Sequence, residues 1–377
     1  MRTLLSVTHR LFYDDKPKQG GADIILNALS DDYNIDIVEH DLMGKLPSIY
    51  RPYISNKKYK VINIWGRYFI IRLAQEVFST LIMVRKKFDM CLSSDPFCGL
   101  ICIILQRLGR VRILLNHCVD FSEKRFSSKF LSYIYVRLAL YVAKKSSLTT
   151  VVSKRAYQYF VNSGVPSSNL MYMPNSPIYV ERKPKKLDGL VNILIVAKNV
   201  SVEYNYFELI KMSSAIIKQG YDIKVLILGE IQDKKYGKQL FDLIMQENIS
   251  SRVELLGYVS GSEYDDILKK SHIGVTFYDK SKTGHFAIFG DSLKIREYAS
   301  YGLPIITEDI YETAIEGSNL GCVVVVSDQL SYVEAIKSML IKDIYEKLSV
   351  NCLNWAKNEN KLIYLEDYRI RINTLMF

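Results

Sequence analysis

The chain has 377 residues, of which 49% are hydrophobic and 24% are charged. This length favours two domains, and this composition excludes a disordered, collagen-like or low-complexity protein. The longest clean apolar run, at 97–105, is far shorter than the roughly 20 residues of a membrane-spanning helix. His9 and Arg10 interrupt the first apolar stretch too early for a signal peptide. We therefore expect a cytoplasmic protein without a transmembrane segment.

The cysteines indicate no metal or disulfide site, whereas the distribution of charge indicates an anionic partner. The six cysteines form no CxxC pair and have no zinc-ligand spacing, so they are interpreted as reduced core thiols. Residues 1–188 carry 29 Lys and Arg against 15 Asp and Glu, whereas residues 189–377 carry 21 against 25. The basic first half indicates an anionic partner such as nucleic acid, an acidic membrane surface or a phosphorylated lipid.

Strands and helices are predicted to alternate along the first half of the chain. A strand at 3–8 is followed by a glycine-bearing loop and a helix at 22–29. Further strands are expected at 34–39, 88–93, 111–115 and 148–152, with Ser153 as the N-cap of the next helix. This alternation predicts parallel βαβ units.

The same pattern restarts after a charged linker at 181–189. Strands are expected at 191–197, 223–229, 253–256 and 273–277, a turn followed by a strand at 302–307, and helices at 206–219, 238–247, 263–270 and 292–301. The stretch 348–375 has helical periodicity to the end of the chain. The second half therefore predicts another α/β domain with a parallel sheet.

One segment combines a small-residue turn, a helix with a glutamate on its first turns, and a Gly-x-Pro end. This segment is GDSLKIREYASYGLP at 290–304, and it resembles the donor-binding motif of GT-B glycosyltransferases, especially the large retaining family four. A helix N-terminus at Ser292 and Leu293 can bind a pyrophosphate with its N–H groups. Glu297 can accept hydrogen bonds from both ribose hydroxyls, and Lys294 can add positive charge. The alternative is an ordinary amphipathic helix.

The resemblance extends over nearly the whole chain and implies further site residues. It implies donor contacts from Lys198 at the end of the strand that opens the second domain, from Gly257, and from Gly20 and Gly21 after the first strand. His117 and Asp120 follow the fourth strand, where the family places its sugar-contacting catalytic residues. His117 could equally be an ordinary loop histidine.

Two departures from the family pattern limit what the resemblance implies. Many members carry a second glutamate eight positions before Glu297, where this chain has Phe289. The usual Lys-Gly pair before the first helix of the second domain is replaced by Tyr204 and Asn205. The loop 279–289 could close over the donor sugar or could be a simple polar connector.

The resemblance implies an α/β protein with the GT-B fold, in which two Rossmann-like domains with parallel sheets face each other and a C-terminal helix crosses back. The expected domains are 1–180 for the acceptor and 181–355 for the nucleotide sugar, with the returning helix at 356–377. No cofactor or essential metal is expected, because lysines and helix N-termini stabilise the phosphates. Pelleting with anionic lipid is expected of the basic half, whereas no nucleic-acid-binding motif is present.

The predicted function is transfer of a hexose-type sugar from a UDP- or GDP-sugar to a glycan or lipid-linked acceptor in cell-surface polysaccharide or glycoconjugate synthesis. Retention of the anomeric configuration is expected, as is a cytoplasmic location with optional peripheral attachment to the inner face of the cell membrane. Two alternatives stay open at this point. One is a nucleotide-sugar epimerase on the same fold, and the other is a non-catalytic protein that binds sugar nucleotides or polyanions.

Overall fold

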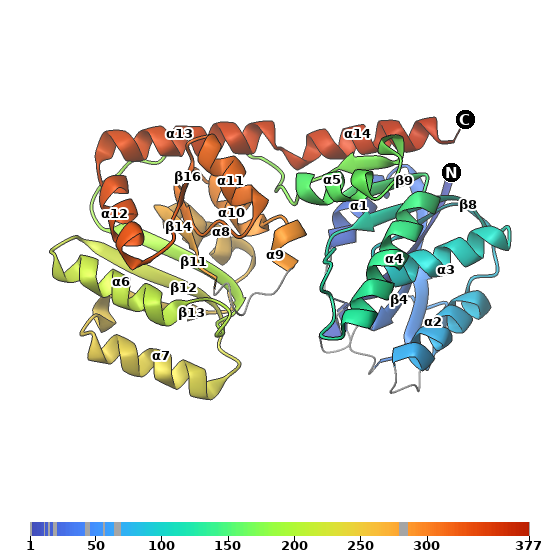
Figure 1. The fold of residues 1–377 in the computed structure, drawn as a ribbon, viewed down its shortest axis with the longest axis horizontal. Helices are drawn as coiled ribbons and strands as arrows, with labels where there is room; N and C mark the ends of the chain where they lie inside the picture. Colours follow the sequence, from blue (N-terminus) through green and yellow to red (C-terminus); the bar gives the residue numbers. More distant parts are fainter. Residues whose placement is uncertain are drawn as a thin grey trace. The chain divides into compact units, whose positions relative to one another are not determined.

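The computed structural model describes residues 2–10, 12–13, 16–17, 21–41, 46–55, 57–63, 69–278 and 286–376. The chain divides into two compact units (Figure 1). The first consists of Met1–Pro174 together with Ile363–Phe377, and the second of Asn175–Leu362. No helix in the described ranges is both long and apolar enough to cross a bilayer.

The first unit is built on an eight-stranded sheet in the order β10-β9-β8-β7-β1-β4-β5-β6. Its strands are β1 (Arg2–Arg10), β4 (Tyr33–Asp41), β5 (Ser48–Pro52), β6 (Lys60–Ile62), β7 (Phe88–Ser93), β8 (Val111–Cys118), β9 (Leu148–Val151) and β10 (Leu170–Tyr172). The pairs from β10 to β4 are parallel, as the sequence predicted, but β5 and β6 join antiparallel at one edge. A separate two-stranded ladder joins β2 (Phe12–Tyr13) to β3 (Lys16–Pro17).

Successive side chains of β1 are buried in different hydrophobic cores, which shows that both faces of this sheet are covered. Leu4 belongs to one hydrophobic cluster, whereas Leu5 and Val7 belong to another. The helices are α1 (Gly21–Leu29), α2 (Phe69–Met83), α3 (Pro96–Arg107), α4 (Lys129–Lys145), α5 (Lys154–Asn162) and α14 (Lys361–Thr374). A 3-10 turn, η1, spans Ser167–Asn169.

The end of the chain packs into the first unit through α14, drawn in red in Figure 1. Leu365, Tyr368 and Ile372 are buried in the same cluster as Leu4 of β1. The stretch 348–375, where helical periodicity was found, contains two helices, because α13 ends at Asn358 and α14 begins at Lys361. The side-chain oxygen of Asn360 accepts hydrogen bonds from the N–H groups of Leu362 and Tyr179, and these contacts fix the break.

The second unit has a six-stranded, fully parallel sheet in the order β13-β12-β11-β14-β15-β16. Its strands are β11 (Val191–Asn199), β12 (Ile223–Glu230), β13 (Val253–Gly257), β14 (Ile273–Thr276), β15 (Ile305–Thr307) and β16 (Val323–Val325). Ile193 and Ile195 of β11 pack on one side of the sheet, and Leu194 packs on the other. Such a sheet, buried on both faces, is the Rossmann-like arrangement that the sequence predicted.

Helices alternate with the strands of the second unit, and among the described residues two helices follow β14 and two follow β16. The helices are α6 (Tyr206–Lys218), α7 (Lys234–Gln246), α8 (Gly261–Lys270), α9 (Phe286–Phe289), α10 (Leu293–Ser300), α11 (Glu312–Asn319), α12 (Gln329–Met339) and α13 (Lys342–Asn358), with a 3-10 turn, η2, at Ser250–Arg252. The helix predicted at 292–301 is α10, and Ser292 is its N-cap residue. The described loops from strand to helix in this unit lie at the carboxyl edge of the sheet, where ligands bind in this class of fold.

Candidate functional site

The helix α10 is fixed rigidly to the sheet of the second unit. The hydroxyl of Tyr298 accepts a hydrogen bond from the Val196 N–H at 2.9 Å and donates to the Val275 carbonyl at 3.4 Å. The ring of Tyr298 lies over Gly274, where a Cβ atom would come within 2.3 Å of it. A side chain at residue 274 would therefore push α10 away from β11 and β14.

The N-terminus of α10 provides the backbone donors that the sequence predicted. Ser292 is buried, and its N–H donates to the Thr313 hydroxyl oxygen at 3.2 Å, while its own side chain makes no capping hydrogen bond. Leu293, the first helical residue, is 51% exposed. The N–H groups of the first turn have no acceptor within a helix, so this end of α10 is suited to an anion.

Lys294 lies against aromatic rings near the start of α10. Its ammonium group donates to the Tyr204 hydroxyl at 3.1 Å and lies 4.5 Å from the centre of the same ring. Burial lowers the pKa of Lys294 to about 8, although the nearby Glu297 opposes this shift. An anion bound beside this ammonium group would favour its charged form. Tyr204, which the sequence showed only as a departure, thus holds the predicted phosphate ligand in place.

Glu297 lies one turn after Lys294, on the same side of α10. It is half-buried, and its carboxylate accepts a 2.6 Å hydrogen bond from the Tyr264 hydroxyl of α8. Burial raises the pKa of Glu297, while Tyr264 and Lys294 act in the opposite direction. A carboxylate kept partly desolvated and aimed by one hydroxyl donor is able to accept further hydrogen bonds from a ligand.

Asp291 and Arg296, at the start of α10, belong to a buried network of charged side chains that the sequence did not predict. The Asp291 carboxylate accepts hydrogen bonds from the Arg296 guanidinium at 2.9 Å, from the Thr313 hydroxyl and from the Asn175 N–H at 2.6 Å. Arg296 is 3% exposed and also pairs with Glu316 at 3.0 Å and Glu359 at 3.4 Å. The network fixes the turn at 290–292 to α11, to α13 and to the start of the second unit.

The other residues predicted to contact the donor lie at strand ends of the second unit and at the start of α1 in the first unit. Lys198 is exposed near the carboxyl end of β11, and Gly257 ends β13 in the left-handed region with φ of 69°. Gly21 is the first residue of α1, whereas Gly20 lies outside the described residues. Phe289 is buried at the end of α9, and most of the predicted loop before it lies outside the described residues.

The two predicted catalytic residues lie at the end of β8 in the first unit. His117 is 1% exposed, and its Nδ1 atom is 2.6 Å from the Thr150 hydroxyl of β9. Asp120 is exposed two residues after the strand, and its backbone carbonyl accepts a hydrogen bond from the Tyr135 hydroxyl at 3.1 Å. Asp120 is therefore presented to solvent, whereas His117 is held inside the sheet edge.

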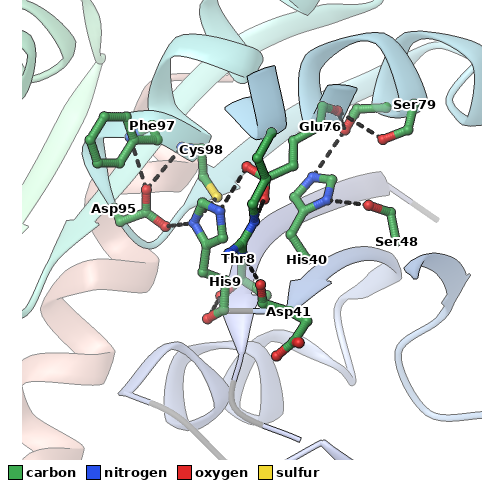
Figure 2. A network of polar contacts seen from close by, with 12 residues as sticks. Thr8, His9, His40, Asp41, Ser48, Glu76, Ser79, Asp95, Phe97 and Cys98 are labelled. Carbon is green, nitrogen blue, oxygen red and sulfur yellow. Dashed lines mark hydrogen bonds and ion pairs between the residues drawn. The ribbon is translucent and has the colours of Figure 1, made fainter. Parts of the chain in front are cut away.

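A second polar cluster at this sheet edge was not predicted (Figure 2). His9, near the end of β1, lies between two carboxylates, with Nδ1 2.8 Å from Asp95 and Nε2 3.0 Å from Glu76. Burial lowers the pKa of His9, but the adjacent Cys98 and Asp95 outweigh burial and raise it well above its usual value. The only sequence signal was the position of His9 and Asp95 directly at strand ends, since Glu76 lies inside α2 without any local motif.

Two units with Rossmann-like sheets are the architecture of the GT-B class of protein. Structural neighbours share this architecture. A UDP complex of Anabaena Alr3699/HepE covers 99% of this chain and 100% of its own, with 13% identity and a TM-score of 0.69. The same Anabaena protein also has a structure with UDP-glucose. The match to the glycosyltransferase from Rickettsia africae ESF-5 covers 100% of this chain and 98% of that protein, with 13% identity and a TM-score of 0.69.

A third neighbour is the apo form of the lipopolysaccharide outer core galactosyltransferase WaaB. The match covers 98% of this chain and 99% of that protein, with 13% identity and a TM-score of 0.67. Residues 179–359 match the family described as glycosyl transferases group 1. This match contains the whole α10 site. No curated protein matches the sequence. The chain therefore has the GT-B fold, and its second unit carries the match to the group 1 glycosyltransferases.

Proposed function

We propose that this group 1 glycosyltransferase moves a hexose-type sugar from a UDP- or GDP-sugar to a glycan or lipid-linked acceptor. The pathway would be the synthesis of a cell-surface polysaccharide or glycoconjugate, with retention of the anomeric configuration. The observation that carries the proposal is the α10 site, where a helix N-terminus, Lys294 and Glu297 lie within two turns. The Anabaena structures with UDP and UDP-glucose support a nucleotide-sugar donor.

The proposed chemistry follows from the charges at this site. The pyrophosphate would bind the N–H groups after Ser292 and the Lys294 ammonium, and the ribose hydroxyls would donate to Glu297. Lys198 and Gly257, at strand ends, would complete the donor contacts, together with Gly20 and Gly21. Under this proposal the leaving diphosphate is stabilised by the protein's own donors, so that catalysis needs no metal.

In the first unit, we assign Asp120 to balancing the positive charge that develops on the sugar. Its exposure at the end of β8 suits a group that meets a substrate. His117 would act by positioning, because its ring is buried against Thr150. An epimerase and a silent binding protein remain the competing functions, and the absence of an acid at Phe289 favours the silent protein.

The decisive experiment is an assay of the purified chain with UDP- and GDP-sugars. Release of nucleoside diphosphate is expected from one of the two donor classes, at a higher rate when a glycan or lipid-linked acceptor is present. Conversion of the donor to an epimer without release of nucleotide would assign the epimerase activity instead. Tight nucleotide binding without any turnover would contradict the enzyme assignment.

We further propose peripheral membrane attachment through α4. Four large apolar side chains are exposed on its first turns, namely Phe130 (70%), Leu131 (37%), Tyr133 (56%) and Ile134 (42%). Exposed basic residues flank them at Lys129, Arg137, Lys144 and Lys145. Apolar side chains beside basic ones are the combination that binds an anionic bilayer surface, at about 1 kcal/mol per well-placed Lys or Arg.

The α4 surface predicts salt-sensitive binding to anionic vesicles. The full chain should pellet with vesicles that contain phosphatidylglycerol, and less so at high salt, because screening weakens the basic contacts. Replacing Phe130 and Tyr133 by Ser should reduce pelleting about tenfold. Phe241→Ser on α7, at a residue that is 53% exposed in the other unit, serves as the control. Equal losses in both variants would contradict the assignment to α4.

A further inference from the structure

His9, Asp95 and Cys98 place three different metal-ligand atoms around one point at the carboxyl edge of the first sheet. The atoms are the His9 Nδ1, an Asp95 carboxylate oxygen and the Cys98 Sγ, and all lie within 4.8 Å of one another. The Nδ1 atom is 2.8 Å from the Asp95 oxygen and 3.3 Å from the sulfur. Figure 2 shows Asp95 and Cys98 at one ring nitrogen of His9, and Glu76 nearby.

The backbone holds the three ligands before any ion arrives. His9 belongs to β1, Asp95 follows β7, and Cys98 lies on the first turn of α3. One Asp95 oxygen caps α3 by accepting hydrogen bonds from the N–H groups of Phe97 and Cys98, at 2.9 and 3.0 Å. The cap leaves the other oxygen directed at His9, so the ligands come from three elements with fixed orientations.

The remote nitrogen of His9 has the partner that metal-bound histidines usually have. Its Nε2 atom lies 3.0 Å from the Glu76 carboxylate, and Glu76 is itself held by Arg72 at 3.0 Å. A histidine ligand typically donates its other N–H to a carboxylate, which fixes its tautomer and makes it a better ligand. With Nε2 bonded to Glu76, the His9 Nδ1 atom can coordinate a metal ion once that ion replaces its proton.

We propose that His9, Asp95 and Cys98 form a Zn²⁺ site. A set of one nitrogen, one carboxylate oxygen and one thiolate suits zinc and excludes Mg²⁺ and Ca²⁺, which require oxygen ligands. Tetrahedral Zn²⁺ with bonds of about 2.0–2.3 Å separates its ligand atoms by about 3.3–3.6 Å, so the Asp95 oxygen must move outward by roughly half an ångström.

Binding of Zn²⁺ releases two protons from its ligands. The ion displaces one proton from the His9 Nδ1 and one from the Cys98 thiol, while Asp95 binds as the carboxylate. Zn²⁺ with Asp95 and the Cys98 thiolate is then electrically neutral. The side chains of His9 and Asp95 are 12% and 25% exposed, which leaves a route from solvent and a fourth position for water. This site is independent of the proposed transfer of sugar.

The test uses the full chain, freed of metal with a chelator and titrated with Co²⁺ and Zn²⁺. We expect one Co²⁺ per chain with a thiolate-to-cobalt charge-transfer band, lost on addition of Zn²⁺. Apparent affinity should rise steeply with pH, because two protons leave. Cys98→Ser should abolish the band. Asp95→Asn, which retains a side chain able to cap α3, should weaken Zn²⁺ binding at least tenfold.

Cys102→Ser on the same helix is the matched control, since Cys102 is also buried but contacts Cys91 instead of His9. Its band should equal that of the natural chain. Circular dichroism and thermal melting establish that each variant is folded. Absence of stoichiometric binding by the natural chain, or a charge-transfer band that persists in Cys98→Ser, would overturn the proposal and leave a hydrogen-bonded His9 only.

Discussion

Glu297→Ala is expected to weaken binding of the donor nucleotide by at least about 100-fold while the protein stays folded. Hydrogen bonds to a charged group contribute about 1.5–3 kcal/mol each, and two ribose hydroxyls would lose their acceptor. Since burial raises the pKa of Glu297, its contribution to stability is present at low pH and lost as pH rises through the folded pKa. At neutral pH ionisation of this side chain therefore adds no stability, and the variant loses only the hydrogen bond with Tyr264 and the packing of the side chain.

The measurement is calorimetric titration with UDP and GDP, combined with a thermal melt of the free protein. Glu263→Ala on α8 is the matched control, because Glu263 is exposed and lies beside Tyr264 in the chain without contacting the α10 site. Tyr264→Phe should cost less than Glu297→Ala, because it removes only the hydroxyl that orients the carboxylate. Unchanged nucleotide affinity in Glu297→Ala would show that the donor does not bind at α10.

Asp291→Ala is expected to destabilise the second unit by about 3–5 kcal/mol. Arg296 would stay buried after losing its closest carboxylate and would keep only Glu316 and Glu359, so its buried charge would be less well compensated. The Asn175 N–H and the Thr313 hydroxyl would lose their acceptor at the same time. Urea unfolding followed by circular dichroism measures the loss.

Glu208→Ala on α6 controls for the removal of a charge, because its pair with Lys211 is exposed and should contribute less than about 1 kcal/mol. The double variant Asp291→Ala with Arg296→Met should lose less stability than the two single variants added together, because Asp291 and Arg296 are partners; Arg296→Met alone also removes the partner of Glu316 and Glu359. A loss of less than 1 kcal/mol in Asp291→Ala would show that the remaining partners, Glu316 and Glu359, suffice for Arg296.

Much of the fold was predictable because apolar periodicity marks each buried parallel strand. Five strands of the second unit's sheet and the start of α10 at Ser292 followed from local pattern alone, whereas β16 was not predicted. The antiparallel edge formed by β5 and β6 did not. In β5, the buried Arg51 pairs with Glu39 of β4 and Pro52 ends the strand, so no alternation of apolar and polar residues indicates a strand.

The proposed donor turn at the start of α10 was predictable because its residues lie within fifteen positions of one another. The contacts that support it were not, since Arg296 finds its partners twenty and sixty-three residues away. The His9 cluster shows the same limit, with His9 and Asp95 separated by 86 residues. Long-range pairing of charges depends on how the sheet brings strand ends together, and short spacing rules do not contain that information.

The return of α14 to the first unit has a practical consequence for anyone who wishes to study one unit alone. The first unit is discontinuous in the chain, because residues 1–174 are completed by 363–377. A fragment that stopped at residue 174 would expose the apolar surface that Leu365, Tyr368 and Ile372 cover, and aggregation would be its expected fate. Joining residue 174 to residue 363 through a short flexible linker keeps that surface covered and is the rational way to express this unit separately.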